Sequence, residues 1–129
     1  MFIDYRIVAL ACLVIVPPAS AQSGQVSAPD TAHANLVAGM KQDLGRLLKA
    51  QDAYLERYRT YTAVLPRADF ATRPERQVVI TAHADKGYSA TMTTTEEAGL
   101  ACGLFVGVGQ APSPVVTGAR QPACWRSAR

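Results

Sequence analysis

The stretch that decides the fold is residues 30–58, which read DTAHANLVAGMKQDLGRLLKAQDAYLERY. Its apolar residues recur at steps of three and four, the spacing that places side chains on one face of an α-helix. The members of this stripe, which only Gln51 interrupts, are Val37, Met40, Leu44, Leu47, Leu48, Gln51, Tyr54, Leu55 and Tyr58. The charged residues assigned to the flanks or the opposite face are Lys41, Asp43, Arg46, Lys49, Asp52 and Arg57. The pattern predicts one long amphipathic helix that needs a partner surface.

Both ends of this helix carry sequence signals. Asp30 is expected to be the N-cap, because its carboxylate can accept from the free backbone N–H groups of the first turn, and Asn35 is a second candidate start. Residues 60–62 are β-branched or aromatic, and Pro66 disfavours helical geometry at the residue before it. The helix is therefore predicted to end near Arg59.

Three β-strands are predicted after residue 75. Residues 78–82 and 88–92 alternate apolar and polar side chains, and Asp-Lys-Gly at 85–87 has the chemistry of a hairpin turn. Residues 100–108, LACGLFVGV, are almost wholly apolar and are predicted to form the best-buried strand. In that strand one face is expected to carry Cys102, Leu104 and Val106, and the other Phe105.

The C-terminal tail is broken by prolines and is expected to hold one short edge strand near residues 115–117. After it, Cys124 returns to the third strand and Trp125 packs against the body of the domain. The predicted fold class is α+β, with one long N-terminal helix packed on an antiparallel meander of three or four strands and a disulfide-tied tail.

The first residues have the features of a secretory signal peptide. Residues 7–16 are an unbroken apolar run of ten, two prolines follow, and Ala19-Ser20-Ala21 matches the rule for cleavage before Gln22. A membrane span needs roughly 20 apolar residues, so an anchor is disfavoured. We expect residues 1–21 to be the signal peptide, residues 22–29 a disordered tether and residues 30–129 a single domain, periplasmic or extracellular.

Cysteine usage agrees with export. The chain has three cysteines, and Cys12 would leave with the signal peptide, so the mature chain keeps Cys102 and Cys124. An even pair in a small exported domain indicates a disulfide, here closing a loop worth about 3 kcal/mol in the chain-entropy model. Lipidation of Cys12 is the disfavoured alternative, because too little apolar sequence precedes it.

No residue pattern indicates catalysis, a cofactor or a metal. The only histidines, His33 and His83, lack a paired spacing with other metal ligands and are expected on the surface. Glu96 and Glu97 are adjacent in a turn, where side chains point apart, and are expected to solubilise it. The net charge is +3 with scattered basic residues, so nucleic-acid binding is also disfavoured.

Three segments resemble a known family. Residues 41–62, with Ala50-Gln51-Asp52-Ala53-Tyr54 and Tyr58-Arg59-Thr60-Tyr61, and the cysteine-bounded segments 102–107 and 122–125 are similar to the globular headgroup of type IV pilins and of type II secretion pseudopilins. The resemblance implies a pilin-like headgroup fold, a disulfide and an envelope or pilus-like protein partner. The glycine cleavage site, phenylalanine and glutamate that open a pilin helix have no counterpart, so filament assembly through a buried N-terminal helix is not implied.

Two functional hypotheses follow. The first is an exported, non-enzymatic structural or interaction protein. A helix of residues 30–58 would span about 43 Å against strands of about 20 Å, so the sheet is expected to cover only residues 47–58 and to leave Val37, Met40 and Leu44 for a partner. The second is a small periplasmic ligand-binding or inhibitory domain with an aromatic-lined groove between helix and sheet.

Overall fold

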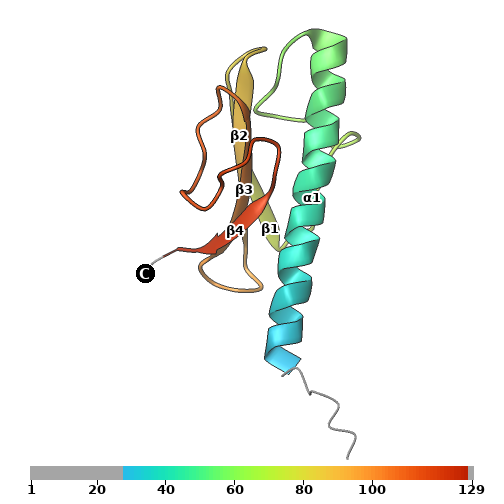
Figure 1. The fold of residues 1–129 in the computed structure, drawn as a ribbon. Coiled ribbons are helices and arrows are strands. Elements are labelled where there is room, and N and C mark those ends of the chain that lie inside the picture. The colour runs from blue at the N-terminus through green and yellow to red at the C-terminus, as the bar shows by residue number, and fades with distance from the viewer. Residues whose placement is uncertain (1–27, 128–129) are drawn as a thin grey trace, which may run out of the picture.

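In the part of the chain that the structure describes, one helix lies along one face of a four-stranded sheet, which gives two layers (Figure 1). The computed structural model describes residues 28–127. The strands are antiparallel and follow the order β1-β2-β3-β4, so each strand pairs with its neighbour in sequence. The elements are α1 (Ala28–Tyr58), β1 (Arg76–Ala82), β2 (Gly87–Thr94), β3 (Leu100–Gly107) and β4 (Ala123–Arg126). The expected α+β class, with one helix on an antiparallel meander, is confirmed.

The helix ends differ slightly from the prediction. The helix begins two residues before Asp30, so Asp30 lies in its first turn, where a carboxylate suits the positive end of the helix dipole, and is not the N-cap. Residues 28–29 of the expected tether are therefore helical, whereas the expected signal peptide and residues 22–27 lie outside the described residues. The helix ends at Tyr58 as predicted, with Arg59 in the left-handed region at φ 61°.

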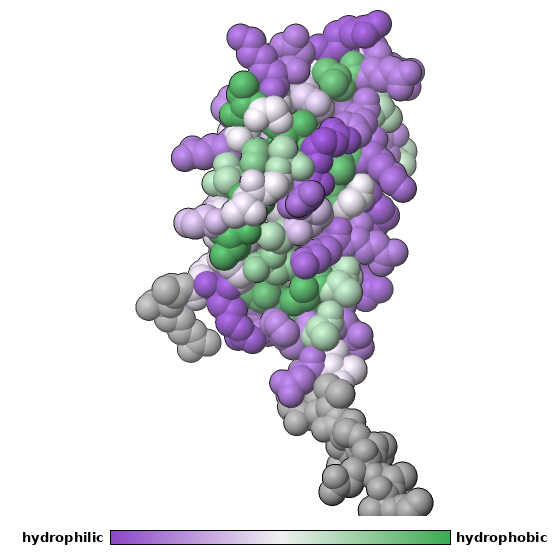
Figure 2. All heavy atoms as spheres, viewed as in Figure 1, coloured by the Kyte–Doolittle hydropathy of each residue, from purple (hydrophilic) through white to green (hydrophobic). Residues whose placement is uncertain are grey.

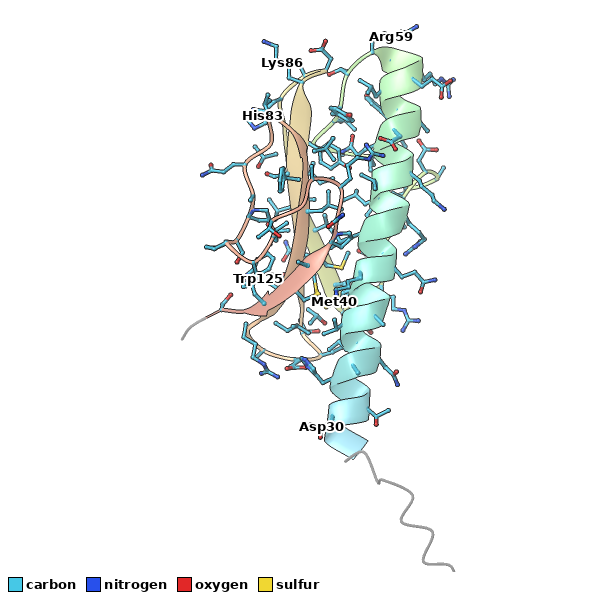
Figure 3. The ribbon with its side chains drawn as sticks, in the orientation of Figure 1. Asp30, Met40, Arg59, His83, Lys86 and Trp125 are labelled. Carbon is cyan, nitrogen blue, oxygen red and sulfur yellow. A yellow bond between two sulfur atoms is a disulfide. The ribbon has the colours of Figure 1, made fainter. Side chains whose placement is uncertain are left out.

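The first half of the helix stripe, together with its centre, forms the core. Met40, Leu44 and Leu47 are fully buried, and Figure 3 shows Met40 between α1 and the sheet. They join a cluster whose fully buried members from the sheet include Tyr88 and Leu104. The prediction that residues 47–58 alone would be covered, leaving Met40 and Leu44 exposed, is therefore wrong.

The C-terminal end of α1 is less buried than its first half because of the path that the chain takes after the helix. α1 lies against β3 and β4, and near its C-terminal end the segment that follows it runs between helix and sheet (Figure 1). Tyr61 from this segment fills that space and packs on Tyr88, with ring centroids 4.9 Å apart. Leu55 is only partly buried, and Tyr58 is 53% exposed. The last turn of α1 thus contributes least to the core.

Gln51, the polar member of the stripe, anchors the segment 59–75. Its side chain is fully buried, yet its Nε2 donates to the carbonyl of Thr62 at 2.6 Å and its Oε1 accepts from the Thr62 N–H at 3.1 Å. Both ends of the amide are satisfied, so its burial carries no unpaired polar group. Leu65 and Phe70 of the same segment pack against the core, as expected.

The predicted hairpin and third strand are confirmed. β1 and β2 pair in continuous register, and the buried face of β3 carries Cys102, Leu104 and Val106, with Phe105 on the other face. Cys102 lies directly opposite Cys124 of β4, and the two form the expected disulfide.

The tail departs from the prediction at residues 115–117, which form no strand; the fourth strand is β4 itself. The segment 108–122 instead crosses the outer face of β3, where a Cβ added to Gly103 would lie 2.6 Å from the Pro112 ring and 3.1 Å from Trp125. Prolines cannot donate to a strand ladder, so this segment packs over the sheet and does not extend it.

We expect shortening a side chain in the first half of the helix to cost far more stability than shortening one at its C-terminal end. Leu44→Ala should lower the free energy of unfolding by about 2–5 kcal/mol, because it leaves a cavity at a fully buried site. Tyr58→Ala should cost less than about 1 kcal/mol, because this side chain is half exposed. Urea unfolding of the two variants measures both values, and equal costs would contradict the observed core.

Candidate functional site

A cleft of about 860 Å³ lies between the first half of α1, the start of β1 and the turn between β2 and β3. It is lined mainly by polar and charged side chains, and its lining among the described residues includes no phenylalanine, tyrosine or tryptophan. We call it the polar cleft. Its charged or titratable lining residues are Asp30, His33, Asp43, Arg73, Arg76, Glu96, Glu97 and Arg126.

A buried ion pair forms the base of the polar cleft. Arg76 Nη1 donates to Asp43 Oδ2 at 2.5 Å, and Arg46 Nη2 donates to Asp43 Oδ1 at 2.5 Å. The side chains of Asp43 and Arg76 are only 10% and 7% exposed. Gly39 leaves room for the arginine, since a Cβ there would lie 3.1 Å from Arg76 Nη2. The pair therefore fastens α1 to the start of β1.

Sequence reasoning missed this pair and assigned Asp43 to the polar flank of the helix. The signal was present, because Asp43 stands three residues after Met40 and four before Leu47, which is the spacing of the buried face. Its partner Arg76 lies 33 residues away, at the start of a strand. Only the folded chain brings the two together.

The environment of Asp43 holds its carboxyl ionised. Burial alone would raise the pKa of Asp43, but the hydrogen bonds and positive charges of Arg46 and Arg76 outweigh burial and place the pKa below its ordinary value. This is the behaviour of a structural ion pair. A general acid or base near neutral pH needs a pKa shifted in the opposite direction.

At the rim of the polar cleft, Glu97 joins the start of α1 to the sheet. His33 Nδ1 lies 2.8 Å from Glu97 Oε2, and Arg126 of β4 forms an ion pair with the other oxygen of Glu97. The hydrogen bond from His33 lowers the pKa of Glu97, burial opposes this, and the charge of Arg126 lowers it further. Glu97 therefore does more than solubilise a turn, which corrects the sequence-based expectation.

The two histidines are not brought together. His33 lines the polar cleft together with Asp30, which lies at the start of α1. His83 lies at the other end of the molecule, in the turn after β1 (Figure 3). Within residues 28–127, no group of three histidine, cysteine, aspartate or glutamate side chains is placed to hold a metal ion. The charges in the polar cleft are largely paired with one another, as between Glu96 Oε2 and Arg76 Nε at 3.5 Å.

A second hollow, of about 510 Å³, lies between the later half of α1 and residues 68–69. The rings of Tyr54 and Tyr58 pack with centroids 4.5 Å apart and are tilted by 41°, and the guanidinium of Arg57 lies 5.4 Å from the centre of the Tyr58 ring. We call this hollow the helix groove. Its lining residues are Arg46, Lys49, Ala50, Ala53, Tyr54, Arg57, Tyr58, Ala68 and Asp69.

The residues proposed from sequence to bind a partner do not form an exposed face. Met40 and Leu44 are fully buried, and Val37 is partly buried and packs against the core. Figure 2 shows that the side of the molecule along α1 is largely hydrophilic in this view. The helix that the structure describes, α1, is not apolar enough along its length to cross a membrane.

The Asp43–Arg76 pair predicts a loss of stability in acid. A carboxyl whose pKa is lowered by folding stabilises the protein fully above its unfolded pKa of about 3.9, and this contribution is lost as the pH falls through the lower pKa of the folded state. Asp43→Asn should cost about 3 kcal/mol at neutral pH, because it leaves the buried Arg76 without a counter-charge. The difference between wild type and variant should shrink below about pH 4.

Urea unfolding between pH 7 and pH 2 measures this difference. Asp52→Asn is the matched control, because Asp52 pairs with Arg120 at a site where both side chains are more than 40% exposed. That variant should lose less than about 1 kcal/mol. A cost for Asp43→Asn that stays constant over the whole pH range would contradict the assignment.

Comparison of the chain with protein-family models, with curated proteins and with solved structures gives no match.

Proposed function

We propose that this protein is an exported, non-enzymatic structural or interaction protein, similar to a pilin or pseudopilin headgroup, that binds an envelope or pilus-like protein. The proposal is supported by the order of helix, antiparallel meander and disulfide-tied tail, which is the order that the resemblance implies.

The observation that carries the proposal is the composition of the helix groove. Tyrosine and arginine are enriched at protein interfaces, where they supply contact area and hydrogen bonds. The helix groove presents two tyrosines in contact with each other, together with Arg57 and Lys49, and the small side chain of Ala53 also lines it. Asp69 is the one carboxylate among its lining residues. A partner with an acidic surface therefore fits it best.

The alternative, a small ligand-binding domain, has the polar cleft in its favour. The cleft lies between helix and sheet, as that hypothesis requires, and its volume of about 860 Å³ is in the range of small-molecule sites, but its lining is polar where the hypothesis predicts aromatic residues. A ligand there would compete with ion pairs that already satisfy Arg76 and Glu97. This cost makes partner binding at the helix groove the preferred function.

We expect a photo-crosslinking amino acid at position 53 to capture a discrete protein in cells that export the chain. Ala53 lines the helix groove, whereas Ala38 is an exposed helix residue outside it and serves as the control position. The adduct should be absent at position 38. It should weaken when Lys49 and Arg57 are both replaced by glutamate, and Lys41→Glu, which changes charge outside the groove, should leave it intact. Equal adducts at positions 53 and 38, or none, would contradict the proposal.

Export makes a separate prediction about the purified mature protein. Intact mass spectrometry should show an N-terminus at Gln22 and a mass two hydrogens below that of the reduced chain, because Cys102 and Cys124 are bonded. Treatment with a reductant should restore the two hydrogens. A retained segment 1–21 would overturn the expected export.

A further inference from the structure

β1 is an edge strand, and one row of its backbone groups points away from the sheet. His83 N–H donates to Gly87 O at 2.8 Å, and Thr95 N–H donates to Glu75 O at 2.9 Å. In an antiparallel ladder the residues that are hydrogen-bonded to the neighbouring strand alternate. These two bonds therefore show that the N–H and C=O groups of the odd-numbered residues of β1 point toward β2. The N–H and C=O groups of Val78, Ile80 and Ala82 therefore face the open edge.

The segment 59–75 occupies this edge only at its two ends. Beyond the end of β1, Tyr61 N–H donates to Ala84 O at 2.8 Å. At the other end, Thr72 Oγ1 donates to the carbonyl of Arg76 at 3.0 Å, and Arg76 N–H donates to Arg73 O at 3.0 Å. Between these points, within the described part of the chain, no hydrogen bond reaches the outward backbone groups of residues 78–82.

The middle of the segment stands away from the strand and leaves a hollow of about 640 Å³. Leu65 and Phe70 line it together with Val78 and Ile80, so its wall is apolar next to the free backbone groups. The exposed Arg67 and Arg73 also line it, and its lining residues include no carboxylate. We call this hollow, bounded by β1 and residues 63–74, the edge slot.

The middle of β1 lacks the charged and proline residues by which many edge strands avoid pairing. Residues 77–82 read QVVITA, without proline, lysine or any other charged residue, and the register with β2 is continuous, without a bulge. Val79 on the outer face is 61% exposed. Such an edge is a template for an added strand, since the new strand satisfies the free N–H and C=O groups.

We propose that the edge slot binds an extended segment of a partner protein as an added strand beside β1. Alternate apolar side chains of that segment lie against Leu65 and Phe70, and acidic residues at its ends meet Arg67 and Arg73. Backbone bonds to Val78, Ile80 and Ala82 supply affinity, and the apolar wall and basic rim supply selectivity. No residue lines both the edge slot and the helix groove, so this surface is additional to the proposed function.

The shape of the edge slot favours a single segment over a second copy of this chain. The contacts of Tyr61 with Ala84 and of Thr72 with Arg76 close its ends, so only a short extended run fits between them. The β1 edge of another copy would bring its own segment 59–75 into the same space. An isolated extended chain meets no such obstacle.

Hydrogen exchange measured by NMR tests the proposal with a defined probe. The probe is a capped seven-residue peptide that alternates valine with threonine and carries glutamate at both ends. In the protein alone, the amides of Val78, Ile80 and Ala82 should exchange faster than those of Val79 and Thr81, which are bonded to β2. Saturating probe should slow the three outward amides by roughly tenfold and leave the other two unchanged.

Matched controls distinguish addition of the probe as a strand from non-specific binding of the probe to the surface. A probe methylated at the backbone nitrogens that face β1 should not protect these amides, because it cannot donate to the strand. Replacing Arg67 and Arg73 by glutamate should weaken probe binding by roughly fivefold, whereas Lys86→Glu, at the hairpin tip, should not. Ala82→Pro removes one outward N–H without breaking a bond to β2, and it should also weaken binding, whereas Ala82→Ser should not.

Two results would overturn the proposal. One is that the exchange rates of the Val78, Ile80 and Ala82 amides do not change when the probe is added, whether or not the probe binds. The other is protection of these amides that rises with protein concentration when no probe is present, which would show that a second copy occupies the edge. Either result leaves the helix groove untouched, because crosslinking at Ala53 tests that surface independently.

Discussion

Burial of one face of α1 against β3 and β4 is the interaction on which the rest of the structure depends. Met40, Leu44 and Leu47 are fully buried, and each such side chain contributes about 1.5–3 kcal/mol relative to exposure. A domain of this size is stable by only about 5–15 kcal/mol, so the loss of this face would remove a large share of the stability. The remaining features hold this face in place: Gln51 anchors the chain that leaves the helix, and the disulfide ties β4 to β3.

The polar interactions set the position of the helix along the sheet. The Asp43–Arg76 pair stands at the border of the core, where an apolar contact alone would tolerate sliding. Glu97 ties the first turns of α1 to the sheet through His33 and to β4 through Arg126. These charges are paired within the fold, whereas the helix groove and the edge slot, which we propose as partner surfaces, are lined by other residues, with Arg46 and Arg76 as the shared exceptions.

The parts of the fold that rest on local periodicity could be predicted from sequence. The spacing of Met40, Leu44 and Leu47 gives the buried face of the helix, and alternation along β1 and β2 gives the hairpin. The prediction failed at residues 115–117, which form no strand, in a segment whose Pro112 lies against Gly103 of β3. It also failed for the candidate partner residues, because their exposure depends on where the sheet lies along the helix. Neither answer is contained in a local pattern.

The sequence by itself determined the class of fold, the helix and three of the strands, and the disulfide partners, because each follows from residue types within one segment or from the count of cysteines. Only the tertiary structure decided which half of α1 is buried, that Arg76 reaches Asp43, and which backbone groups of β1 remain open. These depend on the path of the segment 59–75, which brings residues far apart in sequence into contact. Its position is set by the packing of Tyr61, Leu65 and Phe70, and many loops of similar composition would satisfy the same local rules.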